Sequence, residues 1–283
     1  MKYKYYGTAA AEAIPAIWCD CDTCERARKK GGRNIMSRSQ QTIDDKLLID
    51  FSPDTFMHIT MGLPIRDIHT CIITHDHSDH FYPEDIMFRY GCYAHVENDS
   101  IPFSIYSMKP TIEHMKKIMN DELGSVQATP GRVQLHEIIP FTPFMAEGYK
   151  ITPLNANHDI KSGCVIYLIE KDGKCVLHAN DTGYLPEETW QYLKKHPIHI
   201  DFASFDCTGV VNSPDDNTAQ WHMNYATVKN VRKKLGELGL IDDKTICVVN
   251  HFSHNGKCIY DDIAELVKDD GFLTAYDGFE IEF

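Results

Sequence analysis

Short apolar runs bounded by turn residues dominate the first part of the chain. Examples are KYKYYG at 2–7, TIDDKLLIDFS at 42–52 and DIHTCIIT at 67–74. Runs of this length are typical of β-strands, and the DDK triplet inside the second run suits a hairpin turn. The three segments therefore predict the beginning of one β-sheet.

The pattern weakens between residues 84 and 145 and returns from residue 149. The weak region predicts a helix over 111–123 and short strands over 103–108 and 133–141. Strands are expected over 149–159 and 164–183, and the Asp-Gly pair at 172–173 favours a hairpin turn within the second of them.

Helices and strands alternate in the last third of the chain. Pro186 suits the first turn of a helix over 186–196. The elements expected after it are a strand over 200–208, a helix over 225–239, a strand over 244–254, a helix over 261–271 and a strand over 280–283. Such an order predicts sheets covered by helices. Without a repeat or a Pro/Gly-rich linker, we expect a single domain over 1–283.

Composition narrows the classes of partner. At 283 residues the chain can bury a sizeable core, and no apolar stretch approaches the roughly 20 residues of a membrane-spanning helix. The N-terminus lacks the apolar core of a secretory signal, so we expect a cytoplasmic protein without a membrane partner. The formal charge of -13 disfavours a long nucleic acid as partner. A homodimer remains one option.

The ten cysteines fall into two groups. Seven are scattered, several within apolar runs, which is typical of small core residues in a reducing compartment. The other three, Cys19, Cys21 and Cys24, lie together in WCDCDTC. This spacing suits a structural zinc site, which requires a fourth ligand, and no fourth cysteine lies nearby. A cluster of free surface thiols is the alternative.

Metal-capable side chains gather where strand-like segments end, most densely in THDHSDH at 74–80. The full set is His75, His77, Asp79, His80, His158, Asp181, Asp206 and His251. In an extended segment His75 and His77 lie on one face and can reach one cation, while Asp79 and His80 can turn towards a second. Two such cations would activate water and neutralise developing negative charge. Exposed loop histidines are the alternative.

The stretch THDHSDH resembles the His-X-His-X-Asp-His signature of the metallo-beta-lactamase superfamily, and NANHD, ANDTG and VNHFSH follow in the family's order. The resemblance implies an α/β fold, the αββα sandwich of two mixed sheets flanked by helices, with a two-metal site at one edge. The ligands it implies are His75, His77 and His158 for one metal, Asp79, His80 and His251 for the other, and Asp181 as a bridge. These ligands suit zinc, manganese and iron alike.

A narrower resemblance involves IPAIWCDCDTCERARK at 14–29, which is similar to the cysteine cluster of the phosphoribosyl 1,2-cyclic phosphate phosphodiesterases of phosphonate breakdown. It implies that His254 completes a structural zinc site with the three clustered cysteines. It also implies that FDCT supplies Asp206 and WHMNYATV supplies His222. A protonated His222 would bind a phosphoryl oxygen or protonate the leaving alkoxide, although a surface or helix-capping histidine is the alternative.

These observations predict a dinuclear-metal phosphodiesterase that hydrolyses a small cyclic phosphodiester. Its catalytic residues would be Asp79, Asp206 and His222, and the last would also contact substrate. The resemblance implies conversion of 5-phosphoribosyl 1,2-cyclic phosphate to ribose 1,5-bisphosphate. A basic residue should then hold the 5-phosphate; the sequence does not identify it, and Arg38 and Arg89 are two candidates. The opening GTAAAEAIP and the segment 91–145 depart from the family pattern, which leaves the substrate open.

Other functions are compatible with the same signature. One alternative is another hydrolase of this fold: a ribonuclease Z-like RNA phosphodiesterase, a thioesterase or a lactamase. The first would need a basic RNA-binding arm and the last a signal peptide, and the sequence shows neither. The second alternative is a non-catalytic metal-binding or redox-sensing protein. The seven dinuclear ligands argue against it, because a structural zinc needs only four.

Overall fold

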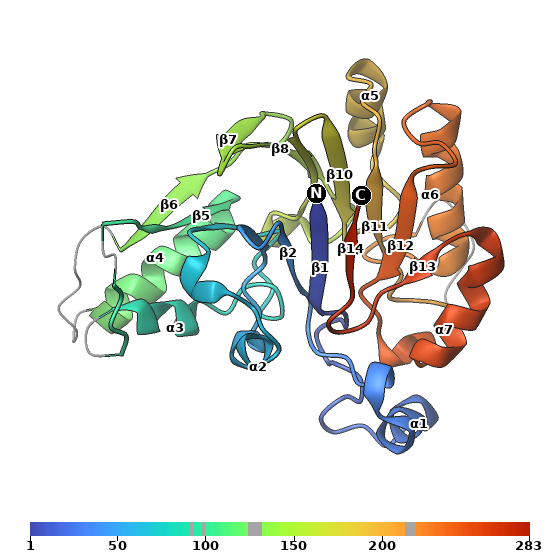
Figure 1. The fold of residues 1–283 in the computed structure, drawn as a ribbon, viewed down its shortest axis with the longest axis horizontal. Helices are drawn as coiled ribbons and strands as arrows, with labels where there is room; N and C mark the ends of the chain where they lie inside the picture. The colour runs from blue at the N-terminus through green and yellow to red at the C-terminus, as the bar shows by residue number, and fades with distance from the viewer. Residues whose placement is uncertain (91–92, 98–99, 124–131, 213–218) are drawn as a thin grey trace.

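Two mixed β-sheets form the centre of the molecule in a computed structural model, which describes all residues except 91–92, 98–99, 124–131 and 213–218 (Figure 1). Within the described residues each sheet has seven strands. The first is ordered β14 (Glu280–Glu282), β1 (Lys2–Gly7), β2 (Gln40–Ile43), β3 (Leu47–Ile49), β4 (Thr70–Ile72), β5 (Phe103–Ser107) and β6 (Val133–Glu137). The second is ordered β13 (Leu273–Thr274), β12 (Ile246–Asn250), β11 (Phe202–Asp206), β10 (Lys174–Ala179), β9 (Val165–Lys171), β8 (Tyr149–Asn155) and β7 (Phe144–Ala146).

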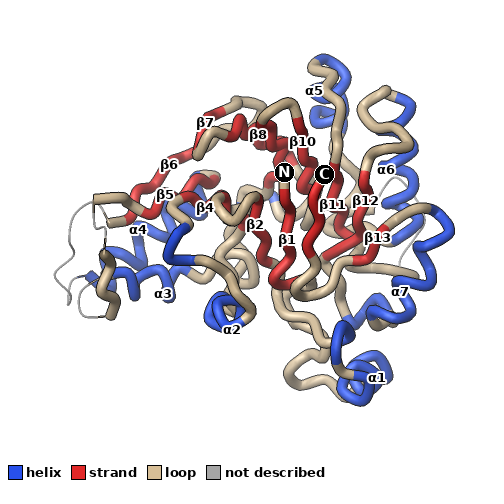
Figure 2. Tube along the Cα trace, in the orientation of Figure 1, coloured by secondary structure: helices blue, strands red, loops and turns tan. Residues whose placement is uncertain are grey.

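Helices cover the outer faces of both sheets (Figure 2). The first sheet is accompanied by α2 (Thr55–Thr60), α3 (Pro83–Ile86) and α4 (Lys109–Leu123), and the second by α5 (Glu187–Lys195), α6 (Tyr225–Glu237) and α7 (Tyr260–Val267). Helix α1 (Asp22–Lys30) lies below the sandwich in Figure 1. Short 3-10 turns occupy Gly32–Asn34, Ile65–Asp67, Met87–Arg89, Ile160–Ser162, His254–Gly256 and Lys268–Asp270. The predicted αββα sandwich is confirmed.

The alternation of side chains along the strands explains these layers. On β9, Val165, Tyr167 and Ile169 belong to the apolar cluster between the two sheets. Ile166 and Leu168 point the other way and join the cluster beneath α5, α6 and α7. Because successive strand residues face opposite sides, a strand that is apolar on both faces must lie in an inner layer.

Both predicted hairpins are present. Asp44 and Asp45 each have positive φ, at 53° and 54°, between β2 and β3. Asp172 and Gly173 likewise have φ of 51° and 78°, and they join β9 to β10 in the register Lys171 to Lys174. Positive φ at both central residues matches the twist of the flanking strands.

Several element limits differ from the sequence-based expectations. Helix α4 begins at Lys109, two residues early, and β6 ends at Glu137. Pro186 caps α5 in an extended conformation, with ψ of 156°, and the helix itself begins at Glu187. Parts of the divergent segment 91–145 lie outside the described residues. Among the described helices, none combines the length and the apolar character needed to cross a membrane.

The topology brings the ends of distant strands to one edge. Strands β3 and β4 are parallel neighbours in the first sheet, and β10, β11 and β12 are parallel neighbours in the second. Carboxyl ends of parallel strands meet at the same edge of a sheet. The metal-capable residues lie at the ends of β4, β10, β11 and β12 or in the segments that follow them, except His158, which follows β8 in the second sheet.

Candidate metal centre

A cavity of about 470 Å³ opens at this edge. The predicted metal ligands His77, Asp79, His158, Asp181 and His251 line it. The two remaining predicted ligands, His75 and His80, are completely buried behind them. All seven side chains are therefore brought together, although they come from four separate segments of the sequence.

The first group of ligand atoms consists of three imidazole nitrogens. His77 Nδ1 lies 2.9 Å from His75 Nε2 and 3.2 Å from His158 Nε2. The outer nitrogens of two of these rings contact oxygen atoms: His158 Nδ1 lies 2.7 Å from the carbonyl oxygen of Trp221, and His75 Nδ1 lies 3.0 Å from Thr74 Oγ1. If these outer atoms carry the protons, the inner nitrogens keep lone pairs directed at one another.

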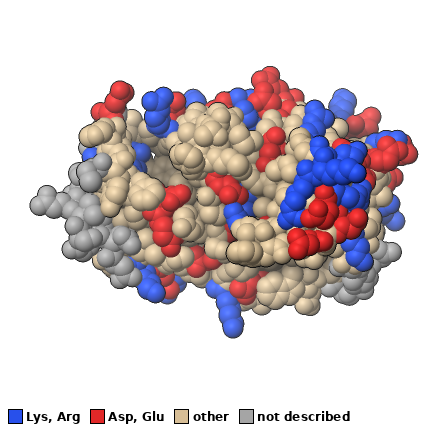
Figure 3. Space-filling model, turned by 90° about the horizontal axis from the view of Figure 1, so that it is seen from below, with Lys and Arg blue, Asp and Glu red and all other residues tan. Residues whose placement is uncertain are grey.

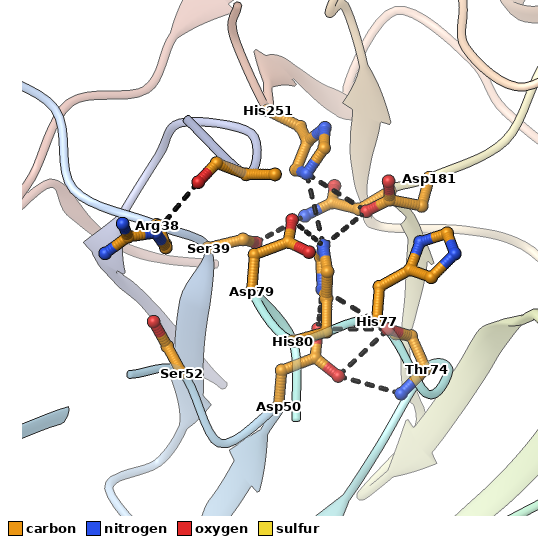
Figure 4. A network of polar contacts seen from close by, with 12 residues as sticks. Arg38, Ser39, Asp50, Ser52, Thr74, His77, Asp79, His80, Asp181 and His251 are labelled. Carbon is orange, nitrogen blue, oxygen red and sulfur yellow. Dashed lines mark hydrogen bonds and ion pairs between the residues drawn. The ribbon is translucent and has the colours of Figure 1, made fainter. Parts of the chain in front are cut away.

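The second group surrounds Asp181 (Figure 4). Its Oδ2 lies 2.8 Å from His80 Nε2 and 3.0 Å from His251 Nε2, and Asp79 Oδ2 lies 3.2 Å from His80 Nε2. The other oxygen of Asp181 lies 3.8 Å from His158 Nε2 in the first group. Asp181 thus stands between the two groups, at the position predicted for a bridging ligand.

Hydrogen bonds hold the histidines of the second group in a single orientation. His80 Nδ1 lies 2.6 Å from the buried carboxylate of Asp50, and His251 Nδ1 lies 2.9 Å from Thr208 Oγ1. The Thr208 hydroxyl donates to the His251 carbonyl oxygen at 2.7 Å, so it accepts from the ring nitrogen. Both rings are then oriented with Nε2 towards Asp181. Outer partners of this kind orient metal-binding histidines.

A buried carboxylate oxygen marks the same place. Asp181 is 3% exposed, and its Oδ2 faces two imidazole nitrogens, His80 Nε2 and His251 Nε2, within 3.0 Å. A carboxylate oxygen and imidazole nitrogens that converge at this depth fit a cation, and these donors suit zinc, manganese or iron.

The electrostatics also favour positive charge here. Burial alone would lower the pKa of His80, but Asp181, Asp79 and Asp50 raise it well above the usual value for histidine. Burial lowers the pKa of His75 well below that value. The pKa of Asp181 lies well below its ordinary value because His251 and His80 outweigh the effect of burial. Ionised carboxylates at this depth require a positive partner.

The backbone is strained at several of these positions. Asp50, Asp181, Trp221 and His251 all have positive φ, between 48° and 70°. Non-glycine residues in this region cost energy and concentrate at functional sites.

His222 stands beside the ligands, and its ring contacts the buried Asp206. His222 Nδ1 lies 2.8 Å from Asp206 Oδ2, which in turn is 3.6 Å from His251 Nδ1. Burial lowers the pKa of His222, but the Asp206 carboxylate more than compensates and raises it to about 9. His222 lines the cavity as a partly exposed side chain. The helix-capping alternative does not apply, because α6 is capped by Asn224.

Sequence reasoning missed the outer partners. Asp50, Thr208, Asp159 and the Trp221 carbonyl each contact a ligand histidine. Of these, only Asp50 could have been found from the sequence. It directly follows the apolar run LLI, as the predicted ligands follow their own apolar runs. A backbone carbonyl has no signature in a sequence.

The cysteine cluster is assembled next to the same edge. Cys19, Cys21, Cys24 and His254 place their ligand atoms within 4.8 Å of one another. His254 Nδ1 lies 3.3 Å from Cys19 Sγ and 3.4 Å from Cys21 Sγ. The contact with His254 lowers the pKa of Cys21 to about 6 against the opposing effect of burial. Three sulfur atoms and one imidazole form a donor set that fits a structural zinc.

The two candidate phosphate-binding arginines are held by other protein groups, and one partner of Arg38, Ala11, lines the cavity. Arg38 Nη1 donates to Asp54 at 2.9 Å, and its Nε donates to the Ala11 carbonyl oxygen at 2.8 Å. Arg89 donates to the carbonyl oxygens of Ile101 and Arg132. Neither arginine is among the described residues that line the cavity.

The fold and the donor set define a protein built to hold divalent cations at one edge of an αββα sandwich. The family model described as the beta-lactamase superfamily domain matches residues 45–238, and the chain belongs to this superfamily. Membership implies divalent metal ions at the centre. A comparison with curated proteins finds no match.

Several solved structures share the fold over the whole chain. Zn²⁺-bound PqqB from Methylobacterium extorquens has a TM-score of 0.75 at 19% identity, with 100% of both chains covered. A diphosphatase from the PhnP family has a TM-score of 0.74 at 18% identity, covering 100% of this chain and 97% of its own. Human tRNase Z, short form, has a TM-score of 0.68 at 15% identity, covering 100% and 99%.

Proposed function

We propose that the protein is a metal-dependent phosphodiesterase that hydrolyses a small cyclic phosphodiester. The observation that carries the proposal is the pairing of His222 with Asp206 in the same cavity as the ligand cluster. A proton donor beside a cation centre suits a reaction that expels an alkoxide from phosphorus. The superfamily membership supports hydrolysis, and two of the similar structures are named as a diphosphatase and a tRNase.

The chain's own groups divide the work of such a reaction. Two divalent cations, one at each group of ligands, would supply Lewis acidity to water and to the phosphoryl oxygens. Asp206 holds Nδ1 of His222, so that Nε2 is the atom available to substrate. As the water oxygen loses a proton to solvent and bonds to phosphorus, one phosphorus–oxygen bond of the ring breaks, and His222 gives its Nε2 proton to the leaving oxygen. His222 then regains a proton from solvent. The product is a phosphomonoester.

The size of the cavity supports a small substrate. A volume of about 470 Å³ suits one sugar phosphate or nucleotide and not a long nucleic acid. The resemblance seen in the sequence suggests 5-phosphoribosyl 1,2-cyclic phosphate, whose hydrolysis would yield ribose 1,5-bisphosphate. That substrate also requires a cationic partner for its second phosphate.

A comparison of substrates tests the proposal. Turnover of cyclic phosphodiesters, linear nucleotides, thioesters and lactams is measured with the metal content determined in parallel. Cleavage of cyclic phosphodiesters by protein with about two active-site metals is expected. Activity confined to thioesters would contradict it. Inert protein with about one metal per chain would support the non-catalytic alternative.

The role of His222 has its own test in leaving-group chemistry. His222→Asn should slow cleavage of a phosphodiester with an alkoxide leaving group by about 100-fold or more, because the proton donor is lost. Cleavage of bis(p-nitrophenyl) phosphate should fall far less, since p-nitrophenolate leaves without a proton. His114→Asn is a matched control, because His114 contacts Asp76 and does not line the cavity. Equal losses for both substrates in His222→Asn would exclude the proton-donor role.

A further inference from the structure

Apart from His222, the part of the cavity beyond the metal ligands is formed by neutral and acidic groups. Its described side chains are those of Glu12, Thr208, Asn212, Gln220, Trp221, Ser253 and Asn255, together with small residues. Amides and hydroxyls bind uncharged polar groups through hydrogen bonds. The cavity therefore offers a large aromatic ring and several neutral donors next to the reacting phosphate.

Apart from His222, which faces the reacting phosphate, no positively charged side chain lines this part of the cavity among the described residues. None of residues 91–92, 98–99, 124–131 and 213–218 is lysine or arginine, so all such residues belong to the part that the structure describes. No lysine or arginine among those described residues lines the cavity. Figure 3, seen from the side on which α1 and α2 lie, shows the largest group of Lys and Arg at the right, intermixed with Asp and Glu, and single Lys or Arg side chains elsewhere, one of them near the centre. A second phosphate group is normally held by arginine or lysine.

Glu12 places a carboxylate on the wall instead. Its Oε1 accepts hydrogen bonds from Ser253 Oγ and, at 3.4 Å, from Asn255 Nδ2. It also lies 3.4 Å from His254 Nε2, and its side chain is 30% exposed. These contacts hold the negative charge at the cavity. An anionic group on the far side of a substrate would meet a like charge there.

Trp221 provides the large surface. The residue is 51% exposed and lies beside the metal ligands. Its backbone is pinned, because its N–H donates to the Asn157 carbonyl oxygen at 3.0 Å and its own carbonyl oxygen accepts from His158 Nδ1 at 2.7 Å. The indole ring lies edge-on to the His158 ring, at 5.4 Å between centroids. An exposed indole beside a metal ligand, on a backbone fixed by two hydrogen bonds, suits stacking with a planar ring.

We propose that this cavity selects cyclic phosphodiesters whose remaining part is an uncharged, planar heterocycle, as in a nucleoside, over sugars that carry a second phosphate. Trp221 and Glu12 are the specificity-determining residues: the first stacks on the ring and the second disfavours an added anion. The proposal rests on the proposed phosphodiester hydrolysis and narrows its substrate class. The proposal differs from the sequence-based expectation, in which Arg38 or Arg89 would bind a second phosphate of the substrate.

Three matched substrates test the proposal on the metal-loaded protein. They are adenosine 2′,3′-cyclic phosphate, the same compound with a 5′-phosphate, and methyl riboside 2,3-cyclic phosphate without the base. We expect kcat/KM to fall about 10-fold or more without the base, through lost stacking. We expect a fall of similar size when the 5′-phosphate is added, because it meets Glu12 and finds no cation.

Two variants assign the effects to residues. Trp221→Leu should raise KM for the adenosine substrate and abolish its advantage over the methyl riboside. Glu12→Gln should bring the 5′-phosphorylated compound closer to its unphosphorylated partner. Phe56→Leu and Glu280→Gln are matched controls, because both residues are exposed and neither lines the cavity. They should leave all three ratios unchanged.

The outcomes separate this proposal from the function beneath it. Equal or faster cleavage of the 5′-phosphorylated compound would overturn the selection, and its selective loss in Arg38→Ala would assign the second phosphate to Arg38. Failure on all three substrates with cleavage of bis(p-nitrophenyl) phosphate retained would also overturn the selection. Failure of metal-loaded protein on these substrates, on 5-phosphoribosyl 1,2-cyclic phosphate and on bis(p-nitrophenyl) phosphate would refute the phosphodiesterase function itself. The wild-type comparison needs no variant, so it decides the matter even where Glu12→Gln folds poorly.

Discussion

Asp50 offers a sharp test of how the metal centre is held together. Its buried carboxylate accepts hydrogen bonds from the Thr74 backbone N–H at 2.8 Å, from the Thr74 hydroxyl at 2.9 Å and from His80 Nδ1 at 2.6 Å. Asparagine has nearly the same shape, and its oxygen can still accept from Thr74. Its amide nitrogen, however, would face His80 Nδ1 as a donor.

The consequence for His80 follows from the tautomer. With a donor opposite Nδ1, the ring is driven to carry its proton on Nε2, the atom that faces Asp181 and His251. Loss of such an outer partner typically weakens metal binding about 10- to 100-fold, or about 1.4 to 2.7 kcal/mol. We expect Asp50→Asn to show this loss in a titration of the metal against a competing chelator, with turnover falling at limiting metal.

Asp76→Asn is the matched control. Asp76 belongs to the same seven-residue stretch, but its carboxylate pairs with His114 at 2.8 Å, and His114 is not a predicted ligand. It should change metal affinity by no more than about twofold. Wild-type affinity in Asp50→Asn, or an equal loss in Asp76→Asn, would refute the orienting role of Asp50. Melting curves of the metal-free proteins exclude a general loss of folding as the cause.

Three further outcomes are expected. Gly183→Ala would place Cβ 2.1 Å from the Ala219 carbonyl oxygen, so the segment that carries Trp221 and His222 must move. Measured turnover should fall about 10-fold or more, while the measured metal content stays unchanged. Burial raises the pKa of Asp277 from 3.8 to about 6 in the folded protein. Protonation of Asp277 therefore stabilises the folded state, and this contribution is complete below about pH 4. It amounts to at most about 3 kcal/mol and is lost as the pH rises through 6. Urea unfolding of wild type and Asp277→Asn should show their stability difference changing across this window, and a constant difference would contradict it. Cys21→Ala should release about one zinc per chain and lower the melting temperature, whereas lost turnover at unchanged stability would argue against a structural site.

The ligands of the metal centre could be predicted from the sequence because they are recognised by residue type and local spacing. THDHSDH places two histidines on one face of an extended segment, and the partners His158, Asp181 and His251 each follow an apolar run. The order of strands and helices likewise predicted the layers, since a strand that is apolar on both faces must be covered twice. Helix α1 escaped prediction because its apolar positions are few.

Tertiary structure decided how the ligands are held and what surrounds them. The acceptors that orient the rings are Asp50, Thr208 and the Trp221 carbonyl oxygen, which lie 30, 43 and 63 residues from the histidines they contact. Proximity over such distances depends on how the sheets pack, and no local pattern encodes it. The cavity wall beyond the metal ligands and His222 also depends on packing, because none of its residues stands out in the sequence. Only the folded structure places the Trp221 ring and the Glu12 carboxylate where an arginine for a second phosphate was expected.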